Sequence, residues 1–244
     1  LSLSLSLSLS LSLSLLSLSQ MLRTGSVSDG SAGLSGLGLL SHGVRASKAV
    51  AMLPQGLVHL VADAHCVGQR GAAVRSSPRA LYESKVEALL DESHCGEIVT
   101  TFEHNLARDP SAVFIGCRSG TDLAIAVSRV PAGTVRKAYR GCVWVWTNNT
   151  GYILPPGQAV LLTNAQRDTS AISGAVSVPL FSLAVSHTHE GANSSCVSAP
   201  GVSLNDMPDL AAATNNITIA QNSPGLQAVW DGGENSAGFQ GRLL

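Results

Sequence analysis

Residues 142–163 read CVWVWTNNTGYILPPGQAVLLT, and this stretch does more than any other to decide the fold class. Its β-branched and aromatic runs, at residues 142–146 and again from Tyr152, are typical of strands. Clusters of turn-forming residues at 148–151 and 155–157 separate these runs from each other and from the apolar run that follows. Short strands joined by tight turns indicate an all-β protein.

The two tryptophans of this stretch are predicted to share one face of a sheet, because alternate side chains of a strand point the same way. Two roles are open to these rings and to the tyrosine that follows them. They can pack in a core, which the alternation favours, or they can stack on sugars, as amphipathic rings do. We therefore take three residues as candidate carbohydrate contacts, with core packing as the alternative: Trp144, Trp146 and Tyr152.

The same signals continue on both sides of this stretch. Residues 48–64 hold two apolar runs around Pro-Gln-Gly, which predicts a hairpin. Residues 25–43 are rich in glycine and serine and predict a loop with one short strand. Helices are predicted at residues 78–92, where apolar side chains fall on one helical face, and at 204–213, capped by Ser203. Further strands are predicted at residues 97–106, 112–117, 123–127, 179–186, 217–220 and 226–230.

The composition agrees with a sheet protein and excludes one class of partner. With 24 glycines and 10 prolines, the chain favours many turns and few helices. Charged residues make up 13% and the formal net charge is −1, so no overall field attracts nucleic acid, and any surface that binds a polyanion must be local. The predicted fold is an antiparallel β super-sandwich with one or two short helices.

Residues 1–19 are almost pure Leu-Ser alternation. A signal peptide or a membrane span needs a continuous apolar segment, and serine at nearly every second position excludes both readings. Repeated CT dinucleotides in DNA encode Leu-Ser in any frame, so the tract is typical of a translated microsatellite. We predict that residues 1–24 are a low-complexity segment, disordered or artefactual, and that the chain does not bind a membrane.

The five cysteines and three glycosylation acceptors bear on the cellular compartment. No CxxC pair occurs, so neither a zinc ribbon nor a thioredoxin motif is supported. A disulfide between Cys66 and Cys95 is a candidate, because it would close the segment that holds the predicted helix. Asn-x-Ser/Thr acceptors, which matter only in a secretory lumen, occur at Asn148, Asn193 and Asn216.

The histidines do not form a recognisable catalytic or metal site. His187 and His189 lie two apart, which suits a metal on an extended strand if Glu190 joins them, but no third ligand is placed by the pattern. Histidines and tyrosines elsewhere stand in no motif that fixes a proton-transfer geometry. We therefore predict no metal, no cofactor and no catalytic residue in this chain.

A series of weak motifs in one order then suggests a family. They are ASKA (46–49), QGLVHL (55–60), IVTTFEH (98–104), WTNNTGYILPPGQ (146–158), RDTSAISG (167–174), FSL (181–183) leading to His187, APG (199–201) and NSPGLQAV (222–229). From about residue 25 to 230 this order resembles the central super-sandwich of family 8 polysaccharide lyases, of the chondroitin and hyaluronan type. The resemblance implies a galactose mutarotase-like sandwich at residues 25–202, followed at 203–244 by a linker helix and a truncated C-terminal β domain.

The resemblance also sets expectations for function. Lyases of this family are carbon-oxygen lyases that cleave uronic-acid-containing polysaccharides, such as glycosaminoglycans, by β-elimination. Their Tyr, His, Arg and Asn catalytic groups sit on a helical toroid N-terminal to the sandwich, so we transfer none of them here. We expect a non-catalytic part, inactive alone, that binds acidic polysaccharide, partners such a toroid, and works outside the cell or in a secretory lumen. Two alternatives are a stand-alone carbohydrate-binding sandwich and a degenerate gene fragment.

Overall fold

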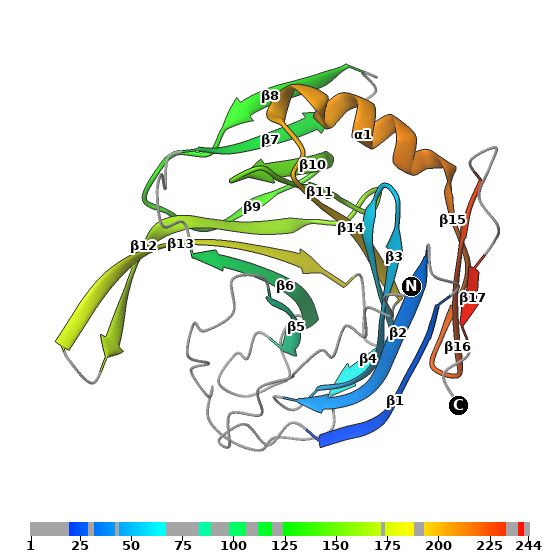
Figure 1. The fold of residues 1–244 in the computed structure, drawn as a ribbon. Helices are drawn as coiled ribbons and strands as arrows, with labels where there is room; N and C mark the ends of the chain where they lie inside the picture. Colours follow the sequence, from blue (N-terminus) through cyan, green and yellow to red (C-terminus); the bar gives the residue numbers. More distant parts are fainter. Residues whose placement is uncertain are drawn as a thin grey trace, which may run out of the picture.

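The chain is built from two antiparallel β-sheets stacked face to face, with a third small sheet and one short α-helix against the outer side (Figure 1). The prediction of an all-β antiparallel sandwich is confirmed. These features come from a computed structural model. It describes residues 20–28, 32–41, 44–66, 83–88, 98–105, 112–118, 124–171, 174–187, 193–232 and 239–241.

The larger sheet has nine strands in the order β1-β2-β3-β4-β14-β11-β10-β7-β8. Strands β14, β11 and β10 come from the second half of the chain, and the four N-terminal strands β1 to β4 join them edge to edge between β4 and β14. In this order the strands are β1 (Gln20–Ser28), β2 (Gly33–Ser41), β3 (Val44–Leu53), β4 (Gly56–Cys66), β14 (Ser194–Pro200), β11 (Thr150–Ile153), β10 (Cys142–Thr147), β7 (Val113–Arg118) and β8 (Ile125–Arg129).

The smaller stacked sheet has five strands, and the outer sheet has three. In Figure 1 the outer sheet stands beside β1 to β3, and the α-helix lies over β7 and β10. The five-stranded sheet runs β5 (Glu83–Ala88), β6 (Ile98–Asn105), β13 (Gly174–Ser186), β12 (Val160–Ala171) and β9 (Thr134–Tyr139). The rest are η1 (Leu204–Asp206), α1 (Met207–Ala213), η2 (Thr214–Asn216), β15 (Ile217–Ser223), β16 (Leu226–Asp231) and β17 (Phe239–Gly241).

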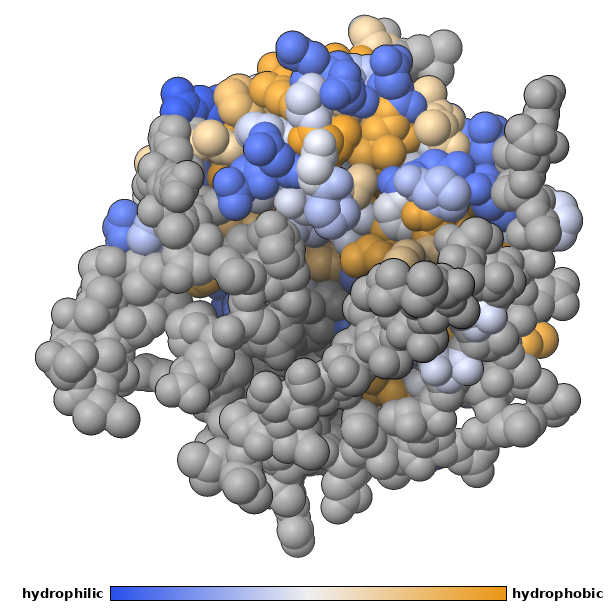
Figure 2. All heavy atoms as spheres, viewed as in Figure 1, coloured by the Kyte–Doolittle hydropathy of each residue, from blue (hydrophilic) through white to orange (hydrophobic). Residues whose placement is uncertain are grey.

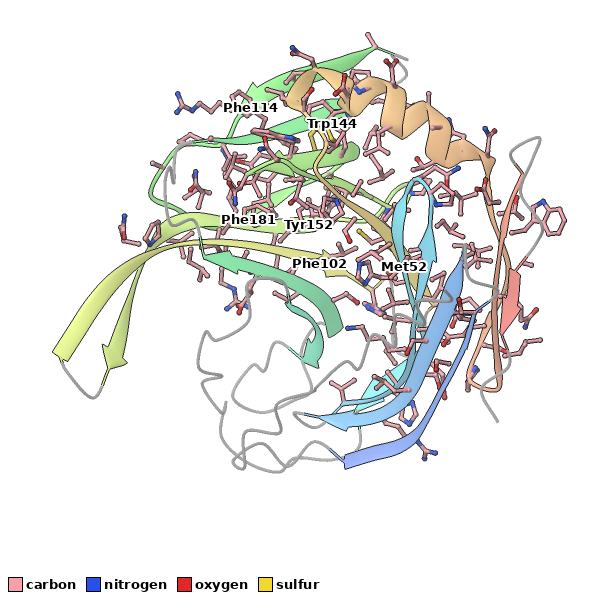
Figure 3. All side chains as sticks on the ribbon, in the orientation of Figure 1. Met52, Phe102, Phe114, Trp144, Tyr152 and Phe181 are labelled. Carbon is pink, nitrogen blue, oxygen red and sulfur yellow. A yellow bond between two sulfur atoms is a disulfide. The ribbon has the colours of Figure 1, made fainter. Side chains whose placement is uncertain are left out.

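An aromatic cluster fills the space between the two stacked sheets. Tyr152 of β11 stacks on Phe181 of β13 with ring centroids 6.0 Å apart, and Phe102 of β6 lies 5.3 Å from the tyrosine ring (Figure 3). Aliphatic side chains at every second position of the surrounding strands complete this core, as the two-residue period of a strand requires. The buried members include Val113, Ile115, Val145, Leu154, Val160, Leu162, Leu183, Val185 and Cys196.

The opposite face of β10 packs against α1, and glycines make the room. Trp144 lies with Met207 and Ala211 of the helix in a second buried cluster. Gly116 of β7 is directly opposite Trp144 in the strand register, and a Cβ at this glycine would collide with the indole ring. A Cβ at Gly151 would likewise lie only 2.5 Å from the Met207 sulfur. The missing side chains therefore let the tryptophan and the helix approach the sheet closely.

The three-stranded sheet is held on β4 and β14 by apolar contacts and by side-chain amides. Val229 packs in a third cluster with residues of β3 and β4. Asn222 donates from Nδ2 to the carbonyl oxygens of Val61 (3.0 Å) and Ser194 (3.2 Å). Gln55, in the β3–β4 turn, donates from Nε2 to Asp231 Oδ2 at 2.9 Å. The motif at 222–229 thus proves to be the hairpin that attaches this sheet.

Two predictions about secondary structure were wrong. Within the helix predicted at 78–92, Glu83–Ala88 form strand β5, because they pair with the edge of β6, and tertiary pairing overrides helix propensity. The loop predicted at 25–43 contains the β1–β2 hairpin, whose second strand pairs along its whole length with β3. β1 begins at Gln20, inside the predicted low-complexity segment, and residues 1–19 lie outside the described residues.

Other local predictions agree with the structure. The hairpin around residues 54–56 is β3–β4, and the helix predicted at 204–213 is η1 followed by α1. Ser203 precedes it, but the predicted side-chain cap is not formed: its Oγ accepts no bond from a backbone N–H of the helix and donates to the Asp206 carboxylate at 2.7 Å. Strands β9 and β17 had not been predicted.

A disulfide joins Cys117 of β7 to Cys142 of β10, which are directly opposite in the register. This is a different pair from the predicted one. Cys95 and the side chain of Cys66 lie outside the described residues, so the Cys66–Cys95 bridge stays a prediction. Cys196, buried in the sandwich core, is a free thiol.

Replacing Gly116 with alanine is expected to lower the free energy of unfolding by about 1–3 kcal/mol, because the new methyl group displaces the buried Trp144 ring. Denaturant unfolding measures the loss, and a red-shifted tryptophan emission should accompany it. Gly225→Ala is the matched control, since a Cβ there meets nothing within 4 Å. Equal stabilities of the two variants would contradict the proposed packing.

Replacing Cys117 and Cys142 together with alanine is expected to cost about 3 kcal/mol of stability, because the bridge closes a 25-residue separation and restricts the unfolded chain. Non-reducing peptide mapping should recover the two cysteine peptides linked, and the same map tests the Cys66–Cys95 pair. Free alkylation of Cys117 in the native, unreduced protein would count against the bridge.

Candidate functional site

The three aromatic residues predicted as carbohydrate contacts lie in two different layers. Trp144 and Tyr152 are each 1% exposed, the first under α1 and the second between the stacked sheets. Trp146 is half-buried, packs on Phe114 at 6.0 Å, and donates from its indole nitrogen to the Val202 carbonyl at 2.9 Å. They therefore form no shared platform, and only Trp146 has part of its ring surface left for a sugar.

The shared face of the two tryptophans agrees with the alternation in the sequence. Both rings contact the cluster under α1, while Val145 between them faces the other sheet. Sequence reasoning missed the third tryptophan, Trp230 on β16, which is 46% exposed. An exposed ring on a strand is what stacking on a sugar requires.

A polar layer crosses the interior where the two sheets meet at β4 and β6. His59 of β4 shares a hydrogen bond with Ser198 of β14, Nε2 to Oγ, at 2.8 Å. Across the sandwich, Thr100 of β6 shares one with His187, Oγ1 to Nε2, at 3.0 Å. Phe102 connects the two pairs, because its ring lies edge-on to His59 at a centroid distance of 5.0 Å. We refer to His59, Ser198, Thr100 and His187 as the buried histidine layer.

The electrostatics of this layer favour neutral groups. Burial, and secondarily the positive charge of Lys48, lower the pKa of His59 from 6.5 to about 3, so its imidazole is uncharged at neutral pH. Burial raises the pKa of the Cys196 thiol, which keeps it protonated and unreactive. A catalytic base must reach the proton it removes, and His59, Ser198 and His187 are all buried. The layer therefore stabilises the contact between the sheets rather than forming an accessible active centre.

No group of three metal-ligating side chains occurs among the residues that the structure describes. His187 is buried, whereas His189 and Glu190, the other members of the metal spacing considered above, lie outside the described residues.

The glycosylation acceptors are all exposed, as acceptors must be. Asn148 and Asn149 both have positive φ, 45° and 56°, in the two-residue turn between β10 and β11, and asparagine tolerates this conformation well. Asn193 differs, because its Nδ2 donates to the Asn222 carbonyl at 2.6 Å and a glycan on that nitrogen would disturb the bond. Asn216 lies in η2.

A group of exposed basic side chains on the strands β7 to β10 was also missed. The cationic edge, as we name it, consists of Arg118, Arg136, Lys137 and Arg140. The available signal was local: residues 124–141 contain four basic residues and no acidic one, although the whole chain has net charge −1. In the upper part of Figure 2, where these strands lie in Figure 1, strongly hydrophilic residues stand among apolar ones.

Three solved structures that share this fold are polysaccharide lyases. A chondroitinase AC lyase matches with a TM-score of 0.58 and 21% identity, over 86% of this chain and 27% of that one. A Paenibacillus xanthan lyase matches at 0.55 and 18%, over 86% of this chain and 19% of that one. A Streptomyces coelicolor A3 chondroitin AC lyase matches at 0.52 and 18%, over 85% and 23%. The chain thus spans about a quarter of the length of these lyases or less.

Sequence comparisons add nothing to this similarity in fold. No sequence family matches the chain, and no curated protein is similar to it. Among the described residues, no helix is long and apolar enough to cross a membrane.

The buried histidine layer should make stability depend on pH. The pKa of His59 is lower in the folded state (about 3) than in the unfolded state (6.5), so below pH 6.5 only the unfolded chain takes up this proton. The contribution of neutral His59 to the free energy of unfolding is fully present above pH 6.5 and is lost as the pH falls towards 3. The free energy of unfolding should fall by up to about 1.4 kcal/mol per pH unit in that window.

Denaturant titrations at several pH values between 6.5 and about 4 measure this slope. The matched variant replaces both ends of the hydrogen bond, His59→Leu with Ser198→Ala, so that no buried polar partner is stranded. In this double variant the free energy of unfolding is expected to fall less steeply with decreasing pH, by up to about 1.4 kcal/mol per pH unit. Identical slopes in the two proteins would show that His59 titrates normally in the fold.

Proposed function

We propose that this chain is the non-catalytic β-sandwich part of a polysaccharide lyase that degrades uronic-acid-containing polysaccharide by β-elimination. The observation that carries the proposal is the similarity in fold, over 85–86% of this chain, to segments of three lyases. The sequence identity is 17–21%, and the matched segments make up 19–27% of the length of the lyase chains. In this proposal the sandwich supports the substrate cleft and contacts acidic polysaccharide, while a helical domain supplies catalysis.

The placement of the titratable residues supports a non-catalytic role. β-Elimination needs a base that reaches the C5 proton and an acid that reaches the leaving oxygen. His59 and His187 are buried, and Tyr152 is buried in the sandwich core. The burial of these three groups supports a structural role for them, and in this proposal the proton transfers belong to another part of the enzyme.

Two observations support an oxidising compartment, either extracellular or a secretory lumen. The Cys117–Cys142 disulfide is of a kind that persists in secreted proteins and is rare in the cytosol. The three glycosylation acceptors are exposed, with Asn148 at the tip of a turn.

A second candidate function is a stand-alone carbohydrate-binding sandwich without a lyase partner. The exposed ring of Trp230 favours it, because a sandwich that binds sugars by itself needs at least one accessible aromatic face. Trp230→Ala separates the two functions, since loss of most sugar binding in this variant would favour the stand-alone module.

The purified chain is expected to bind chondroitin sulfate, hyaluronan or xanthan and not neutral dextran, and to release no unsaturated uronate from any of them. Affinity electrophoresis measures binding, and ultraviolet absorbance of the unsaturated product measures cleavage. Cleavage by this chain alone would overturn the non-catalytic assignment. A chain that neither unfolds cooperatively nor binds would instead fit a degenerate gene fragment.

A further inference from the structure

The basic side chains of the cationic edge come from both stacked sheets at one end of the sandwich. β8 is the last strand of the nine-stranded sheet and β9 is the last strand of the five-stranded sheet. The chain passes directly from one to the other through a turn at residues 130–133, so the two edge strands are joined at one end. Arg118, at the end of β7, reaches the same region, because its backbone N–H donates to the Gly141 carbonyl at 2.8 Å.

The four basic groups of the cationic edge have no acidic partner in the described part of the chain. All four side chains are exposed, and Lys137 lies over the Tyr139 ring with its Nζ 5.2 Å from the centroid. Exposed apolar side chains lie on the two edge strands, with Val127 of β8 at 55% and Val135 of β9 at 66%. The edge therefore presents uncompensated positive charge beside small apolar surfaces, a combination that suits an anionic sugar chain with its apolar ring faces.

The backbone that carries these charges is firmly held. Asn164 is fully buried, and its Nδ2 donates to the Val130 carbonyl at 3.1 Å. Its backbone carbonyl accepts from the Gly133 N–H at 2.8 Å. A bulge in the β9–β12 pairing leaves Arg136 at φ +45°, and its N–H donates to Thr163 Oγ1 at 3.1 Å. A positive φ in a non-glycine residue costs free energy, and such conformations persist where surrounding structure fixes them.

The disulfide lies near the backbone of Arg118 and Arg140, the other two residues of the cationic edge. Cys117 and Cys142 are adjacent in sequence to Arg118 and Gly141, so the bridge lies beside the backbone hydrogen bond that joins these strands. Basic groups on a rigid backbone lose less conformational entropy on binding than groups on a mobile loop.

We infer that the cationic edge is the surface on which this chain contacts an anionic polysaccharide, with Arg136, Lys137 and Arg140 as the main contacts. The inference rests on the proposed function for its choice of ligand, and it adds the residues and the chemistry. Guanidinium groups bind carboxylate or sulfate through paired hydrogen bonds, and Lys137 adds a point charge. With a formal net charge of −1, the whole chain offers no long-range attraction for nucleic acid, so the contact is local.

A different explanation must be separated from this one. Charged side chains on edge strands also prevent edge-to-edge association of sheets. That role requires charge of either sign and no ligand, and its loss produces self-association. A polysaccharide contact requires positive charge, and its loss produces weaker binding by a monomer of unchanged size.

The experiment compares the full chain with a triple variant, Arg136→Gln, Lys137→Gln and Arg140→Gln. Affinity for chondroitin sulfate and hyaluronan is expected to fall about tenfold or more in the triple variant, since three exposed charge contacts are lost. Arg45→Gln is the matched control: it removes an exposed charge from β3, which is separated from β8 by five other strands of the same sheet, and should change affinity less than about twofold. A double variant that keeps the charges, Arg136→Lys with Arg140→Lys, should retain most of the binding.

Three outcomes decide the matter, with size measured by light scattering throughout. Wild-type affinity in the triple variant would overturn the inference that the cationic edge binds polysaccharide, and it would leave the proposed function unaffected. Failure of the wild-type chain to bind any acidic polysaccharide would overturn both, as would tighter binding to a DNA oligonucleotide of similar charge. If the triple variant self-associates, the single variants Lys137→Gln and Arg140→Gln carry the test, and wild-type affinity in both would overturn the inference.

Discussion

The structure depends on the burial of β10 and β11 on both of their faces. Val145 and Tyr152 point into the core between the stacked sheets, while Trp144 points the other way, under α1. A strand covered on both sides has no polar face, which is why residues 142–146 read as an unbroken apolar and aromatic run. The five-stranded sheet on one side and the helix on the other are therefore both required, because either layer alone would leave large rings in water.

Polar groups inside this apolar frame are few, and most join elements that are far apart in sequence. The hydrogen bond between His59 and Ser198 links β4 to β14, and Asn164 holds the turn between the two sheets. In each case a side chain takes up hydrogen-bonding capacity that burial would otherwise leave unsatisfied. Other atoms of the same side chains are exceptions: His59 Nδ1 and Asn164 Oδ1 are buried without a hydrogen-bond partner, and for His59 this is consistent with an imidazole kept neutral by its surroundings.

The sequence allowed the local features to be predicted, but features that depend on distant pairing were missed. The hairpin at residues 54–56 and the strands at 142–154 follow from turn residues and alternation in short windows. β5 was mistaken for a helix because its strand form exists only through pairing with β6. The Cys117–Cys142 bridge depends on the register of β7 against β10, which a linear pattern does not encode. The basic composition of residues 124–141 was a local signal for the cationic edge, but bringing Arg118 to the same place depends on the pairing of distant strands.

The way Asn222 attaches the three-stranded sheet has an implication for how such a chain can evolve. Its amide reaches the main-chain oxygens of Val61 and Ser194, and every amino acid provides such an oxygen. Mutations at the two accepting positions thus leave both hydrogen bonds possible, and only the asparagine itself is constrained. Attachments of this kind let an architecture survive while most side chains are exchanged, which fits a fold still shared with lyases at 17–21% identity.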